Sequence, residues 1–445
     1  MPRTIHLCTE CGHESAGWLG RCPGCGEWNT LVEERPSSSN GAGRSAPSAR
    51  RNGAPAGRPR PLKEVQAPAI ERLRTGVAEL DRVLGGGIVP GSLVLLGGSP
   101  GIGKSTITGG ALGRLAAGGH PVLYVSGEES AVQVRFRAER LGRDALLVPV
   151  LAETDLDVVE ATIEAERPAV CVIDSVQTLH AGGLSGAAGS VGQVREVAGR
   201  LARVAKERGV AIVLVGHVTK DGSLAGPRVL EHLVDCVLQF EGEPERTYRT
   251  LRALKNRFGS TNEVGVFEMR EDGLVEVADP SARFVDEASR APGSVVLCAM
   301  EGSRPVLVEV QALVAESPLE APRRLANGVD RNRLALVLAV LARHAGLSFG
   351  ASDVFASVAG GVRVDEPGAD LAVALALASA VRGVRLGEEG RPLAAFGEVG
   401  LTGELRQVAH PDRRAAEAAR FGLSPLAPCG EVATLAKALE LACSR

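Results

Sequence analysis

The chain of 445 residues carries 50 Lys and Arg against 53 Asp and Glu, so its formal net charge is −3. This balance lacks the whole-chain basic signal of many nucleic-acid-binding proteins, although a local basic stripe is enough to contact DNA. Aromatic residues make up only 3%, which argues against recognition by stacking bases on rows of rings. Residues 1–11 lack the apolar core of a secretory leader, and the longest uncharged apolar stretch, Leu371–Val381, is too short to cross a bilayer. We therefore expect a cytoplasmic protein of roughly two to four domains without a membrane segment.

Four cysteines stand near the start of the chain, as Cys8-Thr-Glu-Cys11 and Cys22-Pro-Gly-Cys25, with ten residues between the two pairs. Each C-x2-C pair can turn two thiolates toward one ion, and two such pairs close a tetrahedral zinc site. Two disulfides or a redox pair are the alternatives, and a reducing compartment disfavours both. Because four thiolates leave no open coordination position, we expect a structural Zn²⁺. Residues 1–35 are then expected to form a ribbon around this ion, and the ribbon is expected to hold a partner or DNA.

The two tryptophans of the chain, Trp18 and Trp28, lie in this same segment. We expect them to pack in the core of the ribbon, with an exposed contact surface as the alternative. Residues 36–61 contain only Pro, Ser, Gly, Ala, Asn and Arg, with five arginines and no acid. Such a segment cannot bury a core, so we predict a disordered basic linker there.

From residue 62 to residue 284, apolar runs alternate with helical patterns. Four apolar runs predict buried parallel strands, at Leu93–Leu96, Val122–Val125, Val170–Ile173 and Val210–Val215. Apolar residues also recur at helical spacing ahead of Gly209, namely Val194, Val197, Leu201 and Val204. The alternation predicts an α/β fold whose parallel sheet is covered on both faces.

A second α/β or α+β domain is expected over residues 285–445. Val295–Met300 and Val306–Val314 predict paired strands, and Ala394–Leu401 predicts another strand. Helical patterns cover Arg331–His344 and Asp370–Arg382.

The strand predicted at Leu93–Leu96 leads into a complete G-x4-G-K-S sequence. It reads Gly98-Ser99-Pro100-Gly101-Ile102-Gly103-Lys104-Ser105-Thr106. Glycines let backbone N–H groups turn toward phosphates, and the following helix N-terminus adds positive potential. Lys104 is expected to reach the β- and γ-phosphates, and the Ser105 hydroxyl to bind Mg²⁺. The segment predicts a P-loop nucleoside triphosphatase.

Three further strand ends supply candidate catalytic groups. Asp174 follows a buried strand and is expected to hold Mg²⁺ through water. Glu128 and Glu129 follow another strand, and we choose Glu128 as the general base that orients the attacking water. A helix-capping role for this pair is the alternative. His217 ends a third strand, where it is either a γ-phosphate sensor or an ordinary polar residue.

Together these segments resemble one family, the bacterial RadA/Sms recombination and repair ATPases, over nearly the whole chain. The residues that carry the resemblance are the four-cysteine ribbon, Thr75–Asp81, Leu84–Gly87, Ser126–Ser130, Ile173–Thr178, Gly216–Lys220, Ala225–His232, Val234–Asp235 and Lys255-Asn256-Arg257-Phe258-Gly259. The last pentapeptide marks the family within the RecA-like class. From spacing alone, Lys255 and Arg257 would be read as a solvated turn. The resemblance implies instead that both cations reach ATP held by a neighbouring subunit.

The resemblance further implies a RecA-like core in a closed homo-oligomeric ring, expected to be a hexamer. It implies activity on single-stranded and branched DNA as a translocase or helicase in branch migration, with a RecA-type recombinase as partner. DNA would be held by the glycine-rich Gly182–Gly192 and by Lys220 and Arg228, without sequence readout. Mobile surface loops are the alternative for these segments.

Residues from about 300 resemble the Lon protease proteolytic domain. Asp365–Asp370 stands where Lon carries its nucleophilic serine, so Gly368 or Ala369 replaces the hydroxyl. His410–Arg414 stands near the expected catalytic lysine, and Arg cannot lose its proton to act as a base. We expect a proteolytically inactive domain that assembles the ring. Four arginines are candidates for an outer DNA-binding surface or for a solvated helix face: Arg406, Arg413, Arg414 and Arg420. An ATP-dependent protease and a RecA-like signalling kinase are the alternative functions.

Overall fold

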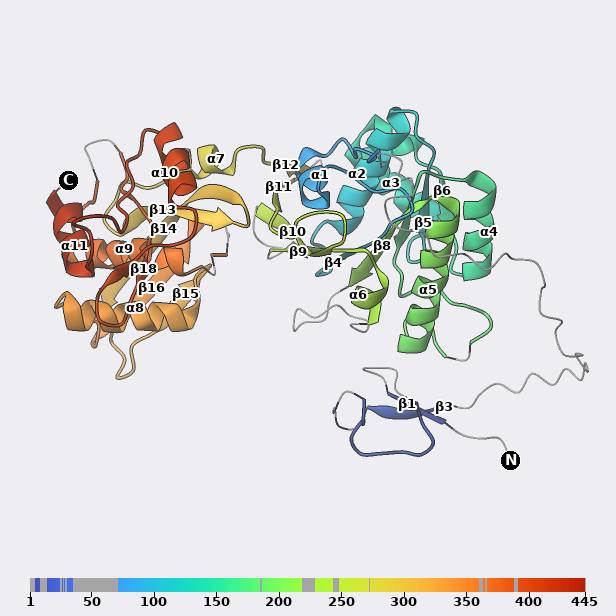
Figure 1. Cartoon of the computed structure of the whole chain (residues 1–445), viewed down its shortest axis with the longest axis horizontal. Helices are drawn as coiled ribbons and strands as arrows, with labels where there is room; N and C mark the ends of the chain where they lie inside the picture. The colour runs from blue at the N-terminus through green and yellow to red at the C-terminus, as the bar shows by residue number, and fades with distance from the viewer. Residues whose placement is uncertain are drawn as a thin grey trace, which may run out of the picture. The chain divides into compact units, whose positions relative to one another are not determined.

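The computed structural model describes residues 5–8, 14–24, 26, 28, 30–34, 71–184, 186–217, 229–242, 248–271, 273–359, 363–364, 366–387 and 391–444 (Figure 1). The chain forms two compact units. The first contains residues 1–76, 86–99 and 104–237, and the second contains residues 77–85, 100–103 and 238–445. In the described part of the chain, no helix is long and apolar enough to cross a membrane.

The N-terminal ribbon is a small antiparallel sheet in the order β2-β1-β3. Its strands are β1 (Ile5–Cys8), β2 (Glu14–Ser15) and β3 (Leu31–Glu34). The buried cluster of the ribbon is Cys8, Cys22 and Leu31. Trp18 and Trp28 are 58% and 69% exposed, so the prediction that they pack in the ribbon core is wrong. Among its described residues, a sheet of this size buries Cys8, Cys22 and Leu31 and offers no second layer that covers the two indole rings.

A nine-stranded sheet carries the P-loop, in the order β12-β11-β10-β9-β4-β8-β7-β5-β6. Its strands are β4 (Leu93–Gly98), β5 (Val122–Ser126), β6 (Val150–Ala152), β7 (Val170–Asp174), β8 (Ala211–His217), β9 (Cys236–Glu241), β10 (Tyr248–Asn256), β11 (Val264–Arg270) and β12 (Gly273–Glu276). Strands β4 to β8 pair in parallel, whereas β10, β11 and β12 pair antiparallel. The four parallel strands predicted from apolar runs are all present, which confirms the α/β expectation.

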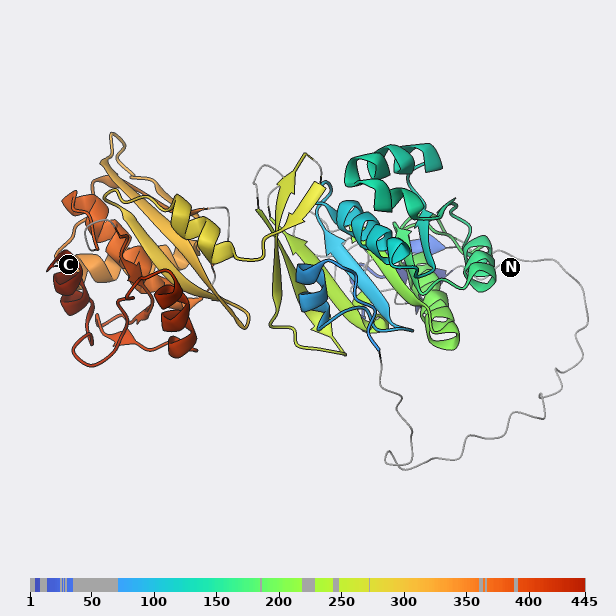
Figure 2. The same cartoon turned by 90° about the horizontal axis from the view of Figure 1, so that it is seen from above.

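Helices cover both faces of the parallel part of this sheet (Figure 2). They are α1 (Ala78–Leu84), α2 (Lys104–Ala117), α3 (Ala131–Leu141), the 3-10 helix η2 (Arg143–Leu147), α4 (Leu156–Glu166), α5 (Val191–Arg208) and α6 (Val229–Leu233). Alternate residues of the strands pack with α4 and α5 in one apolar core, and α2 lies beside α3 and η2. In α5, Val194, Val197 and Leu201 are fully buried, and the helix ends at Gly209 with φ of 70°. The spacing of the buried residues in α5 and the end of this helix at Gly209 therefore agree with the sequence pattern.

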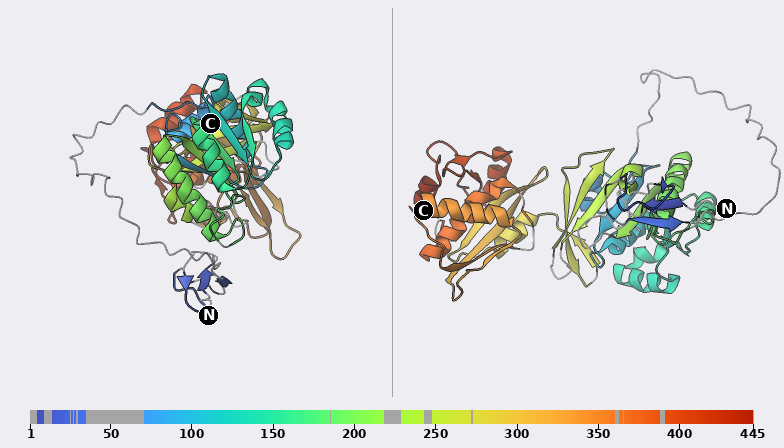
Figure 3. Two further views of the ribbon diagram at one scale, coloured as in Figure 1. Left: turned by 90° about the vertical axis from the view of Figure 1, so that its right-hand side faces the viewer. Right: turned by 90° about the horizontal axis from the view of Figure 1, so that it is seen from below.

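The C-terminal part contains a five-stranded sheet in the order β15-β16-β14-β13-β17 and a two-stranded sheet of β18 and β19. The strands are β13 (Ser294–Glu301), β14 (Arg304–Glu316), β15 (Arg324–Asn327), β16 (Ser352–Val358), β17 (Ala394–Ala395), β18 (Glu398–Val399) and β19 (Leu405–Arg406). The helices are α7 (Pro280–Glu287), α8 (Arg331–His344), the 3-10 helix η4 (Pro367–Ala369), α9 (Asp370–Arg382), α10 (Pro411–Arg420) and α11 (Leu435–Ser444). Helices α8 and α9 pack together, and α9 lies against β13 and β14 (Figure 3). Both helices have the predicted bounds.

The single strand predicted at Ala394–Leu401 is wrong, because it is split into β17 and β18 at Gly397. The Gly397 N–H donates to the Gly368 carbonyl at 2.9 Å, and its carbonyl accepts from the Leu371 N–H at 3.0 Å. A Cβ at this position would lie 2.8 Å from Pro428 Cγ. Both backbone groups of Gly397 are therefore hydrogen-bonded to residues at the start of α9, so they do not pair with a neighbouring strand.

Candidate nucleotide site

The P-loop runs from the end of β4 to the start of α2, where the sequence predicted it. Gly101 and Gly103 have φ of 74° and 115°, values that favour glycine. Ile102 is buried, so this side chain anchors the loop between the two glycines. Ser105 and Thr106 stand in the first turn of α2, whose N-terminus offers unpaired N–H groups to an anion.

The Lys104 side chain is buried and is hydrogen-bonded to the backbone of the P-loop. It is 5% exposed, and its Nζ donates to the carbonyls of Gly98 at 2.8 Å and Ser99 at 3.0 Å. Burial lowers the pKa of the Lys104 amine, while Asp174 and Glu128 act in the opposite direction. The amine and these two carboxylates therefore share one electrostatic environment, and the structure brings together three residues predicted from separate segments.

Asp174 ends β7 and is 8% exposed. The Tyr124 hydroxyl donates to Asp174 Oδ2 at 2.6 Å, and Arg137 Nη2 donates to the Tyr124 oxygen at 2.7 Å. Burial, together with the Asp174 charge, raises the pKa of Tyr124 far above its ordinary value, so this hydroxyl stays a donor. One oxygen of the acid is thus fixed in direction.

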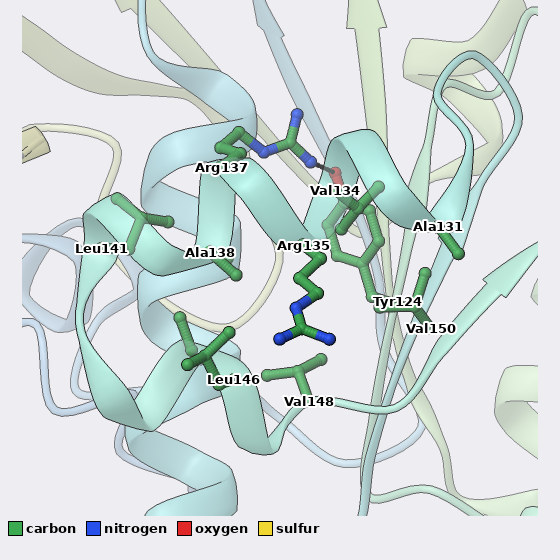
Figure 4. Close-up of a pocket in the computed structure, with 12 residues that line it drawn as sticks. Tyr124, Ala131, Val134, Arg135, Arg137, Ala138, Leu141, Leu146, Val148 and Val150 are labelled. Atoms are coloured by element: carbon green, nitrogen blue, oxygen red, sulfur yellow. Dashed lines mark hydrogen bonds between the residues drawn. The ribbon is translucent and has the colours of Figure 1, made fainter.

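Figure 4 shows this link, with the Arg137 guanidinium turned toward the Tyr124 hydroxyl. The Tyr124 ring forms part of the wall of a cavity of about 380 Å³ between α3, η2 and β6. No sequence motif points to a role for Tyr124 or Arg137. Arg137 stands two turns into α3, and its separation from the acid along the chain offers no local signal.

Glu128 and Glu129 have different surroundings. Glu128 is exposed, and its Oε1 accepts from the Ser175 hydroxyl at 2.5 Å. Glu129 is ion-paired with Arg137 at 2.5 Å. Helix α3 is capped by Ser130, which forms a reciprocal capping box with Gln133, so neither glutamate is used as the cap. Glu129 is therefore held by an arginine, whereas Glu128 is held by a hydroxyl.

The structure describes the remaining predicted residues of the site only in part. His217 ends β8, where its backbone lies opposite Gly98 at the start of the P-loop. Its side chain lies outside the described residues, as do Lys220 and Arg228. Lys255 is half-buried at the end of β10, and Arg257 follows it as an exposed residue. Both belong to the second compact unit, whereas Lys104 and Asp174 belong to the first.

Two of the four predicted zinc ligands lie among the described residues of the ribbon. Cys8 and Cys22 are 0% and 1% exposed. The Gly24 N–H donates to Cys22 Sγ at 3.3 Å, and the Gly26 N–H donates to the Cys22 carbonyl at 2.8 Å. The Gly24 N–H, which is directed at the Cys22 sulfur, would stabilise a thiolate there, and this fits a metal ligand. Cys11 and Cys25 lie outside the described residues.

The segment that resembles the Lon site contains a buried ion pair. Arg414 is 1% exposed and is bonded to both carboxylate oxygens of Glu366 and to the carbonyls of Cys298 at 2.7 Å and Ala409 at 2.9 Å. A Cβ at Gly368 would lie 3.1 Å from Arg414 Nη1. Arg414 is therefore structural, and its assignment to an outer DNA surface or a solvated helix face is wrong. Arg406 and Arg420 are exposed and paired with carboxylates.

Two family models match the chain. Residues 58–223 match an AAA domain, and residues 6–33 match a rubredoxin metal-binding domain. A KaiC-like protein of known structure from Pyrococcus horikoshii is 22% identical and covers 47% of this chain and 99% of its own, with a TM-score of 0.40. That similarity is too low to bear on fold or function.

Curated relatives match almost end to end. The DNA repair protein RadA of Halalkalibacterium halodurans is 50% identical over 94% of this chain and 91% of its own. The proteins of the same name from Bacillus subtilis and Escherichia coli are each 47% identical, over 94% and 95% of this chain and 90% and 91% of their own. With the P-loop, the acid-ended strand and the cysteine ribbon in place, the chain belongs to the RadA family of DNA repair proteins.

Proposed function

We propose that this protein is a DNA-dependent ATPase of recombinational repair that forms a homo-hexameric ring and moves on single-stranded DNA. It promotes branch migration of recombination intermediates or stalled forks. The observation that carries this proposal is the meeting of Lys104, Asp174 and Glu128, in which the two carboxylates act on the Lys104 amine. Lys255 stands at the end of β10, and Arg257 follows that strand. In a ring, these two cations would complete the site of ATP bound to a neighbouring subunit.

In this mechanism the P-loop residues 98–106 hold the phosphates. Ser105 and Asp174 hold Mg²⁺, which neutralises charge on the phosphates when bound. Tyr124 keeps Asp174 in one orientation, and the hydroxyl of Ser175 does the same for Glu128. Glu128 accepts the proton of the attacking water. His217 senses the γ-phosphate, and Lys255 and Arg257 of the adjacent subunit stabilise the transition-state charge.

DNA is held by the segment Gly182–Gly192 together with Lys220 and Arg228, through phosphate contacts repeated around the ring. The four thiolates of Cys8, Cys11, Cys22 and Cys25 bind structural Zn²⁺, and the ribbon contacts a RecA-type recombinase. Residues 1–35, 36–61, 62–284 and 285–445 act as ribbon, linker, ATPase domain and Lon-like domain. The last is not a protease, since Gly368 has no hydroxyl and Arg414 is buried against Glu366.

The test is ATP hydrolysis with and without single-stranded DNA, followed by unwinding of a three-stranded branched substrate. We expect Lys104→Ala and Lys255→Ala to lose DNA-stimulated turnover by at least about 10³-fold. The exposed-lysine control Lys206→Ala should behave as wild type. Cys25→Ala should lose only the stimulation of unwinding by a recombinase. DNA-independent turnover by a monomer would contradict the proposal, and peptidase activity or stable autophosphorylation would favour the alternative functions.

A further inference from the structure

The β13–β14 hairpin of the C-terminal sheet ends in a two-residue turn that touches the loop between β10 and β11. The Ser303 N–H donates to the Asn262 carbonyl at 2.7 Å, and the Ser303 hydroxyl donates to Glu263. A Cβ on Gly302 would lie 1.4 Å from the Asn262 carbonyl oxygen. Only glycine permits this approach, so the turn and the end of loop 257–263 are in backbone contact.

The two residues that flank the turn are held by ion pairs. On one side, Arg252 of β10 donates to Glu301 at 2.6 Å and to Glu241 at 3.0 Å. On the other side, Arg304 donates to Glu79 of α1 at 3.0 Å. Glu301 and Glu79 are buried, and loss of one partner from a buried ion pair is costly because the remaining charge is uncompensated. The hairpin tip is therefore fixed on β10 and α1 at once.

The start of loop 257–263 is fixed by Asn256. Its amide nitrogen donates to the carbonyls of Val83 and Leu84 at the end of α1, each at 3.4 Å, and its Oδ1 accepts from the Phe258 N–H at 2.9 Å. Arg257 lies directly after this anchor. The loop that presents Arg257 is thus held by α1 at its start and by the hairpin tip at its end.

We propose that the hairpin tip, Glu301–Arg304, is a positioning element for ATP hydrolysis that sets where Lys255 and Arg257 lie. This inference rests on the proposed function, in which these cations stabilise the transition state of ATP bound to the next subunit. A misplacement of about 1 Å in a catalytic geometry can cost roughly 100-fold in rate. Gly302, Ser303 and Arg304 are then positioning residues, and the Lon-like sheet takes part in catalysis without any peptidase chemistry.

The test compares two glycines that have nearly the same positive φ. Gly302 and Gly346 have φ of 62° and 66°, but a Cβ at Gly346 meets nothing within 4 Å. With saturating single-stranded DNA, Gly302→Ala should lower kcat roughly 100-fold with the KM for ATP within about twofold of wild type. Gly346→Ala should keep wild-type kcat. Thermal unfolding of both variants measures the common cost of the positive φ.

Arg257→Ala tests the proposed role of Arg257 separately from the role of the hairpin tip. If the tip acts through Arg257, adding Gly302→Ala to Arg257→Ala causes no further loss of kcat, because residues that act as one unit are not additive. Multiplying losses would overturn the inference, as would wild-type kcat in Gly302→Ala alongside a lost kcat in Arg257→Ala. Wild-type kcat in Arg257→Ala would overturn the proposed role of Arg257 and the inference with it.

A milder variant, Ser303→Ala, tests the inference if Gly302→Ala does not fold. Ser303→Ala removes only the hydroxyl bond to Glu263 and places no demand on the backbone. It should lower kcat about tenfold, with the same lack of additivity toward Arg257→Ala. Ser317→Ala is its control, because Ser317 is also half-buried and its hydroxyl accepts from the Leu319 N–H at 3.2 Å. Equal kcat in both serine variants would contradict the inference.

Discussion

At the scale of single residues, Asp174, the acid proposed to bind Mg²⁺, is oriented by a neighbour outside the recognised motifs. Asp174 receives the Tyr124 hydroxyl at 2.6 Å, and Arg137 connects that hydroxyl to Glu129. A buried hydrogen bond to a carboxylate contributes about 1.5–3 kcal/mol, and it also fixes the direction of the free oxygen. Tyr124 therefore fixes the orientation of the Asp174 carboxylate.

We predict that Tyr124→Phe lowers kcat for ATP about tenfold and raises the Mg²⁺ concentration needed for half-maximal rate. The ring stays in place, so packing is kept and only the bond to Asp174 is lost. Tyr248→Phe is a matched control, because the other tyrosine of the chain is also buried and its hydroxyl accepts from Arg283 at 3.1 Å. A Mg²⁺ titration that is identical in the two variants would contradict this role.

At the scale of elements, the glycine-rich segment before α5 is tied to that helix by Gln193. The Gln193 side chain is 2% exposed and accepts from the Ala181 N–H at 2.8 Å. Its amide nitrogen donates to the carbonyls of Ala181, Leu184 and Gly186 at 3.3, 3.1 and 3.4 Å. One side chain thus holds several turns of a segment in which glycine gives the backbone little stiffness.

We predict that Gln193→Leu releases this segment, because a side chain of similar size can no longer bond the four backbone groups. Amide hydrogen exchange at residues 182–184 should become roughly tenfold faster or more, since one lost buried hydrogen bond costs about 1–3 kcal/mol. Stimulation of ATP turnover by single-stranded DNA should fall in parallel. Gln311→Leu, at an exposed glutamine of β14, is the control. Unchanged exchange in Gln193→Leu would show that the loop is held by other contacts.

At the scale of the molecule, the second compact unit joins β9–β12 and α1 to the C-terminal sheet. Glu301 lies at this junction. Burial raises its pKa to about 7, and the charges of Glu366 and Glu241 add to the shift while Arg252 opposes it. Between about pH 4.5 and pH 7 the folded protein therefore keeps a proton that the unfolded chain has lost, and stability falls as pH rises through this range.

We predict that Glu301→Gln gains stability relative to wild type as pH rises from about 4.5 to about 7, by at most about 3 kcal/mol. Glutamine has no proton to lose, so the variant lacks this slope. Thermal unfolding at several pH values measures the difference, with Glu320→Gln, at an exposed acid, as the control. A difference between variant and wild type that is constant with pH would contradict the assignment.

The sequence by itself determined the parts of this protein that depend on neighbours along the chain. Apolar runs located the parallel strands, the P-loop stood between its strand and helix, and α8 and α9 have the predicted bounds. These patterns work because glycine, the strand period and the helix period act over a few residues. The four-cysteine ribbon and the pentapeptide likewise indicated the family before any tertiary contact was known.

Only the tertiary structure decided which distant residues meet. It turned Trp18 and Trp28 outward, buried Arg414 against Glu366, and split the strand expected at Ala394–Leu401. It also joined Tyr124 and Arg137 to Asp174. In each case the outcome depends on the burial and charge supplied by segments far away in the sequence. Local sequence patterns do not predict such partners, because burial free energy and ion pairing depend on what packs against a residue.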